Sequence, residues 1–112
     1  MAAAKRNRST ALDTRSSEEM MRHAGEAAAL LRALANEQRL SILCCLVGRR
    51  LSVGQINEYV DLSQSALSQH LAVLRENNLV TTEKQAQTVY YSVPPGPGHK
   101  VLAVLQSIYC AR

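Results

Sequence analysis

The sequence predicts a mainly α-helical domain with one small β-hairpin, an α+β fold in the order of four helices, two strands and a last helix. Two observations predict this. Apolar residues recur at helical spacing in several segments, and one stretch, 79–93, holds two short runs rich in Val, Thr and Tyr. Of the 112 residues, 46% are hydrophobic and 20% are charged, which is the composition of one ordinary globular domain.

Residues 1–17 are expected to form a flexible N-terminal arm, because they are rich in Ala, Arg, Ser and Thr without a sustained apolar period. The arm holds four of the 13 Lys and Arg residues and one of the nine Asp and Glu residues, so it accounts for most of the net charge of +4. The net charge is therefore a weak pointer to the partner of the folded domain, residues 18–112.

The first two helices follow directly from caps and apolar spacing. Ser17 is a good N-cap for a helix that ends near Ala35, and Asn36 can cap a second helix that Gly48 ends. The second helix is expected to be buried nearly all round, since apolar residues cover most of its circumference. These residues are Leu40, Ile42, Leu43, Cys44, Cys45, Leu46 and Val47.

A short third helix begins after Ser52, with Val53, Ile56 and either Tyr59 or Val60 facing inward. A tight connection leads to Ser63, which begins a fourth helix that runs to about Asn77. Its apolar line consists of Leu67, Leu71 and Leu74, and its opposite face carries Ser65, Ser68, Gln69 and Ala72.

The segments 79–83 and 88–93 are predicted to be the strands of a hairpin, joined by residues 84–87. A run of Pro and Gly over 94–98 ends the second strand. Apolar residues from Val101 to Ile108 then predict a last helix that reaches Cys110.

A short helix, a tight turn, a helix with a polar outer face and a hairpin together predict a winged helix-turn-helix. A helix that enters the major groove needs small, hydrogen-bonding side chains, and Gln64, Ser65, Ser68 and Gln69 meet that need. The alternative is that these are ordinary solvated residues. The DNA-binding interpretation is favoured because Glu and Lys, the common residues of an exposed helix face, are absent between Gln64 and Val73.

The stretches ALANEQRLSIL, LSVGQINEYVDLSQSALSQHLAVLRENNLV and TVYYSV resemble the ArsR/SmtB family of bacterial winged-helix repressors, over residues 24–112. The resemblance implies a homodimer formed through the first and last helices, which binds operator DNA with dyad symmetry. The residues that it implies at the DNA are Gln64, Ser65, Ser68, Gln69 and His70 on the recognition helix, and Lys84, Gln85 and Gln87 at the wing tip.

Two of the remaining assignments have open alternatives. His70 either faces DNA or packs beside the leucine line, and Arg75 either contacts a phosphate or is simply solvated. Arg39, near the start of the second helix, is expected to have a structural role.

Metal-sensing members of the family carry a Cys-x-Cys pair where this chain has residues 53–57, which contain no cysteine. His99 stands without an Asp or Glu anywhere from Thr88 to Arg112, so we expect no metal site of the family's usual kinds. The cysteines Cys44, Cys45 and Cys110 could simply be small apolar residues of the core.

The cysteine pattern resembles the BigR, HlyU and SqrR branch of the family, which responds to persulfides or oxidants by linking two thiols. That resemblance implies a link between Cys44 and Cys110, as a disulfide or a tetrasulfide, with Cys45 as a possible substitute. The expected function is a repressor whose inducer is a reactive sulfur species or an oxidant, with no cofactor.

Three alternatives remain. The repressor could sense a metal or metalloid through an unusual set such as Cys44, Cys110 and His99, or have no effector. A small thiol enzyme would need an exposed, electropositive cysteine beside an acid or base, so we expect the chain not to be an enzyme. The longest uninterrupted apolar run is Ile42 to Val47, and no apolar stretch follows Lys5, Arg6 and Arg8, so we expect a cytoplasmic protein without membrane contact.

Overall fold

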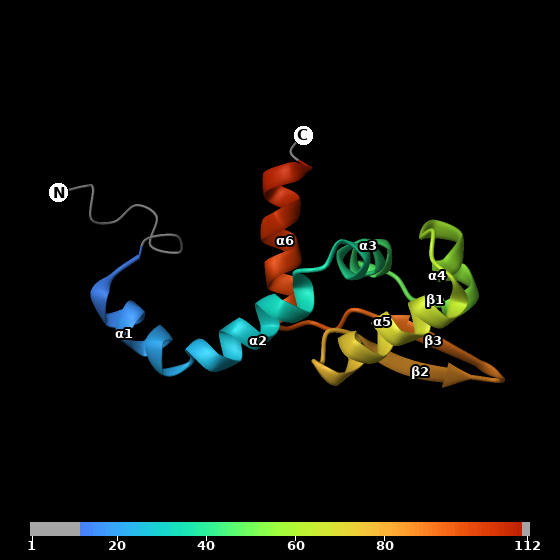
Figure 1. Cartoon of the computed structure of the whole chain (residues 1–112), viewed down its shortest axis with the longest axis horizontal. Helices are drawn as coiled ribbons and strands as arrows, with labels where there is room; N and C mark the ends of the chain where they lie inside the picture. Colours follow the sequence, from blue (N-terminus) through green and yellow to red (C-terminus); the bar gives the residue numbers. More distant parts are fainter. Residues whose placement is uncertain (1–11, 111–112) are drawn as a thin grey trace.

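The computed structural model describes residues 12–110, and in that range the chain forms six helices and a three-stranded antiparallel sheet. The domain is elongated, with extents of 58 × 34 × 25 Å. Figure 1 shows α1 and α2 extending to one side of α6, with the remaining helices and the sheet on the other. The elements are α1 (Thr14–Arg22), α2 (Ala24–Leu34), α3 (Glu37–Leu46), β1 (Leu51–Ser52), α4 (Val53–Tyr59), α5 (Gln64–Glu76), β2 (Thr81–Gln85), β3 (Thr88–Ser92) and α6 (Pro97–Tyr109).

The core is built from aliphatic side chains of α3, α4, α5 and the segments that follow them. The predicted leucine line of α5 is confirmed, since Leu67, Leu71 and Leu74 are all buried. Each such side chain stabilises the fold by roughly 1.5–3 kcal/mol relative to an exposed one. The fully buried side chains are Ile42, Leu43, Leu46, Ile56, Leu67, Leu71, Leu74 and Val80.

The N-terminal region differs from the prediction in two ways. The first helix begins at Thr14, because Asp13 rather than Ser17 caps it by accepting a hydrogen bond from the Ser16 backbone N–H at 2.7 Å. The predicted single helix is also two helices, since the backbone leaves helical geometry at His23. Gly25, a weak helix former, lies just after the break. Residues 14–17 are thus helical, and residues 1–11 of the predicted arm lie outside the described range.

Helix α3 has the predicted ends but not the predicted burial. Asn36 caps it by accepting from the Arg39 N–H at 3.0 Å, and Gly48 follows it with a φ of 82°, a conformation that favours glycine. Only Ile42, Leu43 and Leu46 are buried, and Cys44 is exposed. The prediction of burial nearly all round is wrong, because one face of α3 lines an open cavity.

Strand β1 was not predicted, since two residues are too short to show strand alternation. It pairs with β3 through Leu51 opposite Tyr91, and β3 also pairs with β2 through Thr82 opposite Tyr91. The sheet order is therefore β1-β3-β2, with β3 in the middle. This places the wing directly beside the residues that begin α4.

The ends of the hairpin and of the last helix are shifted relative to the prediction. Strand β2 ends at Gln85 and strand β3 begins at Thr88. The loop between them is therefore only Ala86 and Gln87, and Ala86 has a φ of 58°. Helix α6 begins four residues before the predicted Val101, because Pro97 occupies the first turn, where proline is well tolerated. The inward residue left open in α4 is Val60, which is 9% exposed, and not Tyr59, which is 57% exposed.

Candidate nucleic-acid interface and thiol pair

The turn between α4 and α5 is held by one side chain that sequence reasoning missed. The Asn57 amide donates to the Leu62 carbonyl at 2.9 Å and to the Val60 carbonyl at 3.4 Å. Ser63 then caps α5 by accepting from the Ala66 N–H at 3.1 Å. Ser52 and Gln55 form a reciprocal capping box at the start of α4, so both helices of the pair have defined beginnings.

The outer face of α5 carries most of the residues predicted to meet DNA. Gln64, Ser65, Ser68 and Gln69 are exposed, whereas His70 is partly buried. The buried leucines of α5 pack the helix against the core, so the exposed side chains have a defined position relative to the rest of the domain. The face is free of acidic side chains from Gln64 to Arg75, so it can approach a polyanion without repulsion from its own helix.

The wing presents Lys84, Gln85 and Gln87, all of them exposed. Gln85 is partly engaged already, since its side-chain oxygen accepts a hydrogen bond from Arg50 at 2.6 Å. Arg50 also donates to the Glu83 carboxylate and stacks over the Tyr90 ring. Sequence reasoning gave Arg50 no role, because its partners follow more than 30 residues later in the chain.

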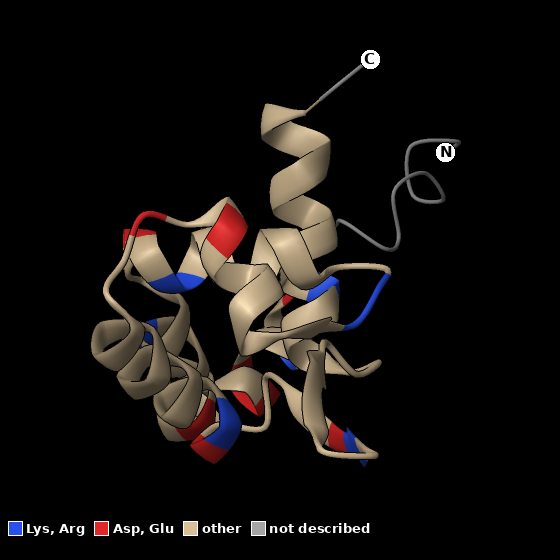
Figure 2. Ribbon diagram, turned by 90° about the vertical axis from the view of Figure 1, so that its right-hand side faces the viewer, with Lys and Arg blue, Asp and Glu red and all other residues tan. Residues whose placement is uncertain are grey.

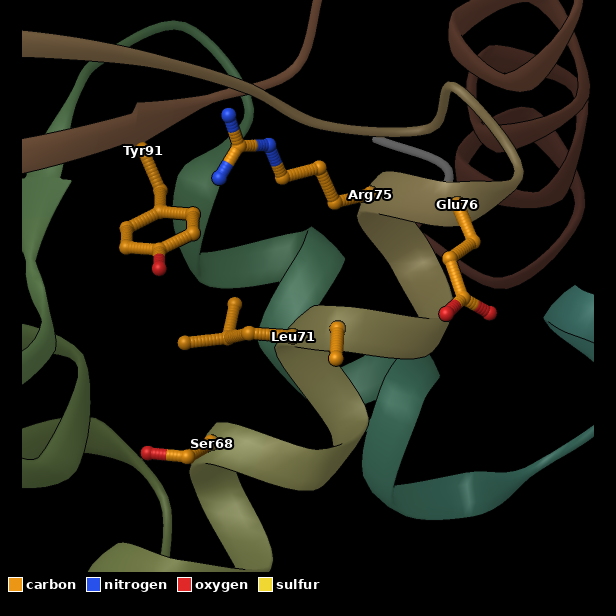
Figure 3. Close-up of a pocket in the computed structure, with 6 residues that line it drawn as sticks. Ser68, Leu71, Arg75, Glu76 and Tyr91 are labelled. Carbon is orange, nitrogen blue, oxygen red and sulfur yellow. The ribbon is translucent and has the colours of Figure 1, made fainter.

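A notch lies between α5 and the sheet, with a volume of about 390 Å³. Figure 3 shows Ser68 and Arg75 on α5 and Tyr91 on β3 pointing toward the same opening, while the Glu76 carboxylate points to the other side of the helix. The lining residues are Ser68, Leu71, Ala72, Arg75, Glu76 and Tyr91. Tyr91 was not among the predicted site residues, because a strand tyrosine is more often a core residue.

The predicted thiol pair is brought to one place. Cys44 on α3 and Cys110 at the end of α6 both line a cavity of about 420 Å³, and both are exposed free thiols. The other lining residues are Leu40, Leu102, Leu105, Gln106 and Tyr109. Partial burial raises the pKa of the Cys44 thiol, and the negative charge of a nearby Cys110 thiolate raises it further.

Cys45 lies differently from the other two cysteines. Its thiol donates to the Ile42 carbonyl at 3.1 Å, it packs against the core, and it is absent from the lining of the cavity. Burial is the main cause that raises the pKa of the Cys45 thiol, while the Arg49 guanidinium opposes the rise. Arg49 in turn donates to the Cys45 carbonyl at 2.8 Å and to the Tyr59 hydroxyl at 3.0 Å.

The unusual ligand set Cys44, Cys110 and His99 does not assemble. His99 lies in the first turn of α6 and Cys110 just beyond its last residue, so about 16 Å of helix separates them. Within residues 12–110, no group of three or more His, Cys, Asp and Glu side chains is placed to hold a metal ion. The described range also has no helix long and apolar enough to cross a membrane.

A short capped helix, a turn held by Asn57, a second helix with an exposed polar face and an adjoining hairpin define a winged helix-turn-helix protein of the DNA-binding class. The model of the bacterial regulatory protein arsR family matches residues 36–82, which contain both helices of the pair. The chain belongs to the ArsR family and is a transcriptional regulator.

Similar proteins cover most of the chain. It is 47% identical over 93 residues to the transcriptional activator HlyU of Vibrio cholerae, spanning 83% of this chain and 86% of the relative. It is 51% identical over 83 residues to the nodulation protein NolR of Rhizobium meliloti, spanning 74% and 68%. The crystal structure of the repressor BigR of Xylella fastidiosa superposes with a TM-score of 0.78 at 34% identity, covering 89% of this chain and all of the other. The names of HlyU and BigR describe transcriptional regulators, in agreement with the expectation that the chain is not an enzyme.

Proposed function

We propose that the chain is a repressor that binds operator DNA of dyad symmetry as a homodimer, and that a covalent link between Cys44 and Cys110 releases it. The observation that carries the proposal is the shared cavity, in which two thiols from helices far apart in the sequence face the same space. The resemblance to HlyU and BigR supports the class of regulator. Gln64, Ser65, Ser68 and Gln69 would face DNA, with His70, Arg75 and the wing residues at their flanks.

The homodimer is supported by apolar side chains that a single chain leaves uncovered. Helix α1 buries none of its residues, although Met20 and Met21 are 56% and 74% exposed. On α6, Val104, Ile108 and Tyr109 are exposed as well. Figure 2 shows no charged residue along the C-terminal part of α6, and the sequence has none in 101–109. A second copy that covers α1 and α6 would remove this surface from water.

The chemistry begins at Cys110 in this proposal, since the raised pKa leaves Cys44 mostly as the protonated thiol. The Cys110 thiolate attacks the outer sulfur of an organic persulfide, the bond between the two sulfurs of that persulfide breaks, and the departing thiolate takes up a proton. Cys110 then carries a persulfide. Attack by the Cys44 thiolate on its inner sulfur forms the disulfide and expels hydrosulfide.

Two other routes lead to a link. If both cysteines become persulfides, joining their outer sulfurs forms a tetrasulfide, and one further organic persulfide accepts the two electrons and becomes a thiol and hydrogen sulfide. With hydrogen peroxide, Cys110 becomes a sulfenic acid with loss of hydroxide, and condensation with the Cys44 thiol releases water. A disulfide needs Cα atoms about 4.4–6.8 Å apart, whereas a tetrasulfide spans a wider gap.

The link would act on DNA through α6. Tying the end of α6 to α3 shifts a helix of the proposed dimer interface, and therefore changes the spacing of the two copies of α5. Half-sites of a palindrome lie about 34 Å apart, so a displacement costs contacts at both. A 100-fold loss of affinity corresponds to about 2.7 kcal/mol, within the usual range of allosteric coupling.

The test is operator binding, with the operator first recovered by selection from random duplexes, before and after treatment with glutathione persulfide. We expect a loss of affinity that dithiothreitol reverses, and no loss in Cys44→Ser or Cys110→Ser. Cys45→Ser is the matched control and should respond as the wild type does. Mass spectrometry separates a disulfide from a tetrasulfide by the mass of two sulfur atoms. A Cys110→Ser variant that still responds would refute the switch.

A further inference from the structure

We propose that Ser68, Arg75 and Tyr91 form a site for one backbone phosphate of DNA, at the junction of the recognition helix and the wing. Each lines the notch between α5 and β3, and each presents a hydrogen-bond donor: two hydroxyls and a guanidinium. The proposal rests on α5 being the helix that enters the major groove. It adds Tyr91, which lies on β3 and not on the recognition helix.

The three donors are unused by the rest of the described protein. Between Leu12 and Cys110, no side-chain hydrogen bond of the structure involves Ser68, Arg75 or Tyr91, and neither ion pair involves Arg75. Glu76, the one carboxylate at the notch, turns its oxygens away from the guanidinium (Figure 3). The notch therefore has an unbalanced positive charge and two free hydroxyl donors, and groups of these kinds bind anions.

The sequence of α5 explains why there is room. Ser68, Ala72 and Arg75 are spaced four and three residues apart, so they lie on one stripe of the helix. The two small residues leave the notch open, and the arginine closes one end. Figure 3 shows the Arg75 guanidinium extending across the notch toward the side of Tyr91, while Ser68 lies about two turns nearer the start of the helix.

Tyr91 is held firmly on the opposite wall. It lies on the middle strand, paired with Leu51 on one side and with Thr82 on the other, and its ring packs against the core. Its hydroxyl is therefore positioned by the sheet and not by a loop. A donor fixed in this way loses little conformational freedom when it binds.

Groove dimensions identify the ligand as a phosphate and not a base. A helix about 10–12 Å across nearly fills a major groove about 12 Å wide. Side chains at its leading face then meet base edges, and side chains on its flank meet the phosphates that border the groove. The notch is on the flank of α5 that faces the sheet, and phosphate contacts of this kind come mainly from Arg, Ser and Tyr donors.

The experiment measures binding to a random-sequence duplex about 30 base pairs long, enough for two half-sites, by fluorescence anisotropy over a range of salt concentrations. Removing a hydroxyl donor weakens binding without changing charge, so Tyr91→Phe should lower the affinity roughly three- to tenfold with an unchanged salt slope. Arg75→Gln removes one charge, so the slope should fall by about 0.9 for each bound protomer. The double variant should lose less than the product of the two losses, because both donors serve one phosphate.

Tyr90→Phe is the matched control, since Tyr90 is the preceding residue of β3 and lies under Arg50 and not in the notch. It should bind as the wild type does. An affinity of Tyr91→Phe within about twofold of wild type, or losses that multiply in the double variant, would overturn the site. So would an effect of Tyr91→Phe confined to the selected operator, which would indicate a base contact. Wild-type protein that binds no duplex at all would instead overturn DNA binding itself.

Discussion

The Arg50 guanidinium donates a hydrogen bond to the Glu83 carboxylate at 2.8 Å, which ties the residue before β1 to the middle of β2. The same guanidinium donates to Gln85 and lies 4.6 Å from the centre of the Tyr90 ring. One side chain thus contacts both strands of the wing. The Arg50 and Glu83 side chains are 44% and 70% exposed, so solvent weakens their attraction to about 0–1 kcal/mol.

Replacing Arg50 with methionine should therefore affect the order of the wing more than global stability. We expect Arg50→Met to lower the free energy of unfolding by about 0.5–1.5 kcal/mol, from the lost ion pair and cation–π contact together. Amide hydrogen exchange in 83–90 should accelerate by more than the global change accounts for. Lys84→Met is the control, because Lys84 is exposed and has no ion pair among the described residues. Equal exchange in the two variants would contradict this role.

Arg39 closes the end of α2, as expected of a structural residue. Its Nε donates to the Ala33 carbonyl at 2.6 Å and its second guanidinium nitrogen to the Arg32 carbonyl at 3.1 Å. Carbonyls at a helix C-terminus lack partners in the helix. Arg39→Met keeps an unbranched apolar stem but removes both bonds, so unfolding in urea should show a loss of about 1.5–3 kcal/mol. Arg32→Met, an exposed position, should stay within about 0.5 kcal/mol of wild type.

Gly98 is needed for the close approach of α6 to Leu79. A Cβ at Gly98 would collide with the end of the Leu79 side chain, which is 3% exposed and would have to shift. Gly98→Ala should destabilise the protein by about 1–3 kcal/mol in thermal unfolding, despite the better helix propensity of alanine. Gly25 supplies the opposite case, since nothing lies within 4 Å of its added Cβ. Gly25→Ala should stabilise by about 0.5–1 kcal/mol, and a change of the same sign in both variants would refute the steric explanation.

What the sequence could and could not predict follows from how local each feature is. The leucine line of α5 and the cap Ser52 are encoded by neighbours in the chain, and both predictions are confirmed. The break at His23 follows no equally strong local signal. The hydrogen bond from Arg50 to Glu83 and the position of Tyr91 opposite Arg75 depend on contacts between distant parts of the chain. Local residue spacing does not reveal such contacts. The cysteine pair came from family resemblance, since periodicity placed Cys44 on an apolar face without indicating α6 as its neighbour.

Cys44 and Cys110 should differ in reactivity, and the pH dependence of their alkylation rates should show the difference. Because burial and the Cys110 charge raise the pKa of Cys44 above its ordinary value of 9.0, its thiolate is scarce near neutral pH. In a Cys45→Ser parent, iodoacetamide should therefore alkylate Cys110 before Cys44 near neutral pH, and the Cys44 rate should keep rising beyond pH 9.0.

The raised pKa of Cys44 should also make the stability of the protein depend on pH. A thiol whose pKa is raised by folding stabilises the folded state fully below its unfolded pKa, and this contribution is lost as the pH rises through the folded value. The difference in urea midpoint between the Cys45→Ser parent and its Cys44→Ser derivative should accordingly shift against the parent as the pH rises past 9.0. Adding Cys110→Ser to both proteins should reduce that shift, since it removes the neighbouring charge but leaves the burial of Cys44. Equal alkylation rates at Cys44 and Cys110, together with a midpoint difference that is constant with pH, would show that the reactivity of Cys44 is not suppressed. The proposal that Cys110 attacks first would then be wrong.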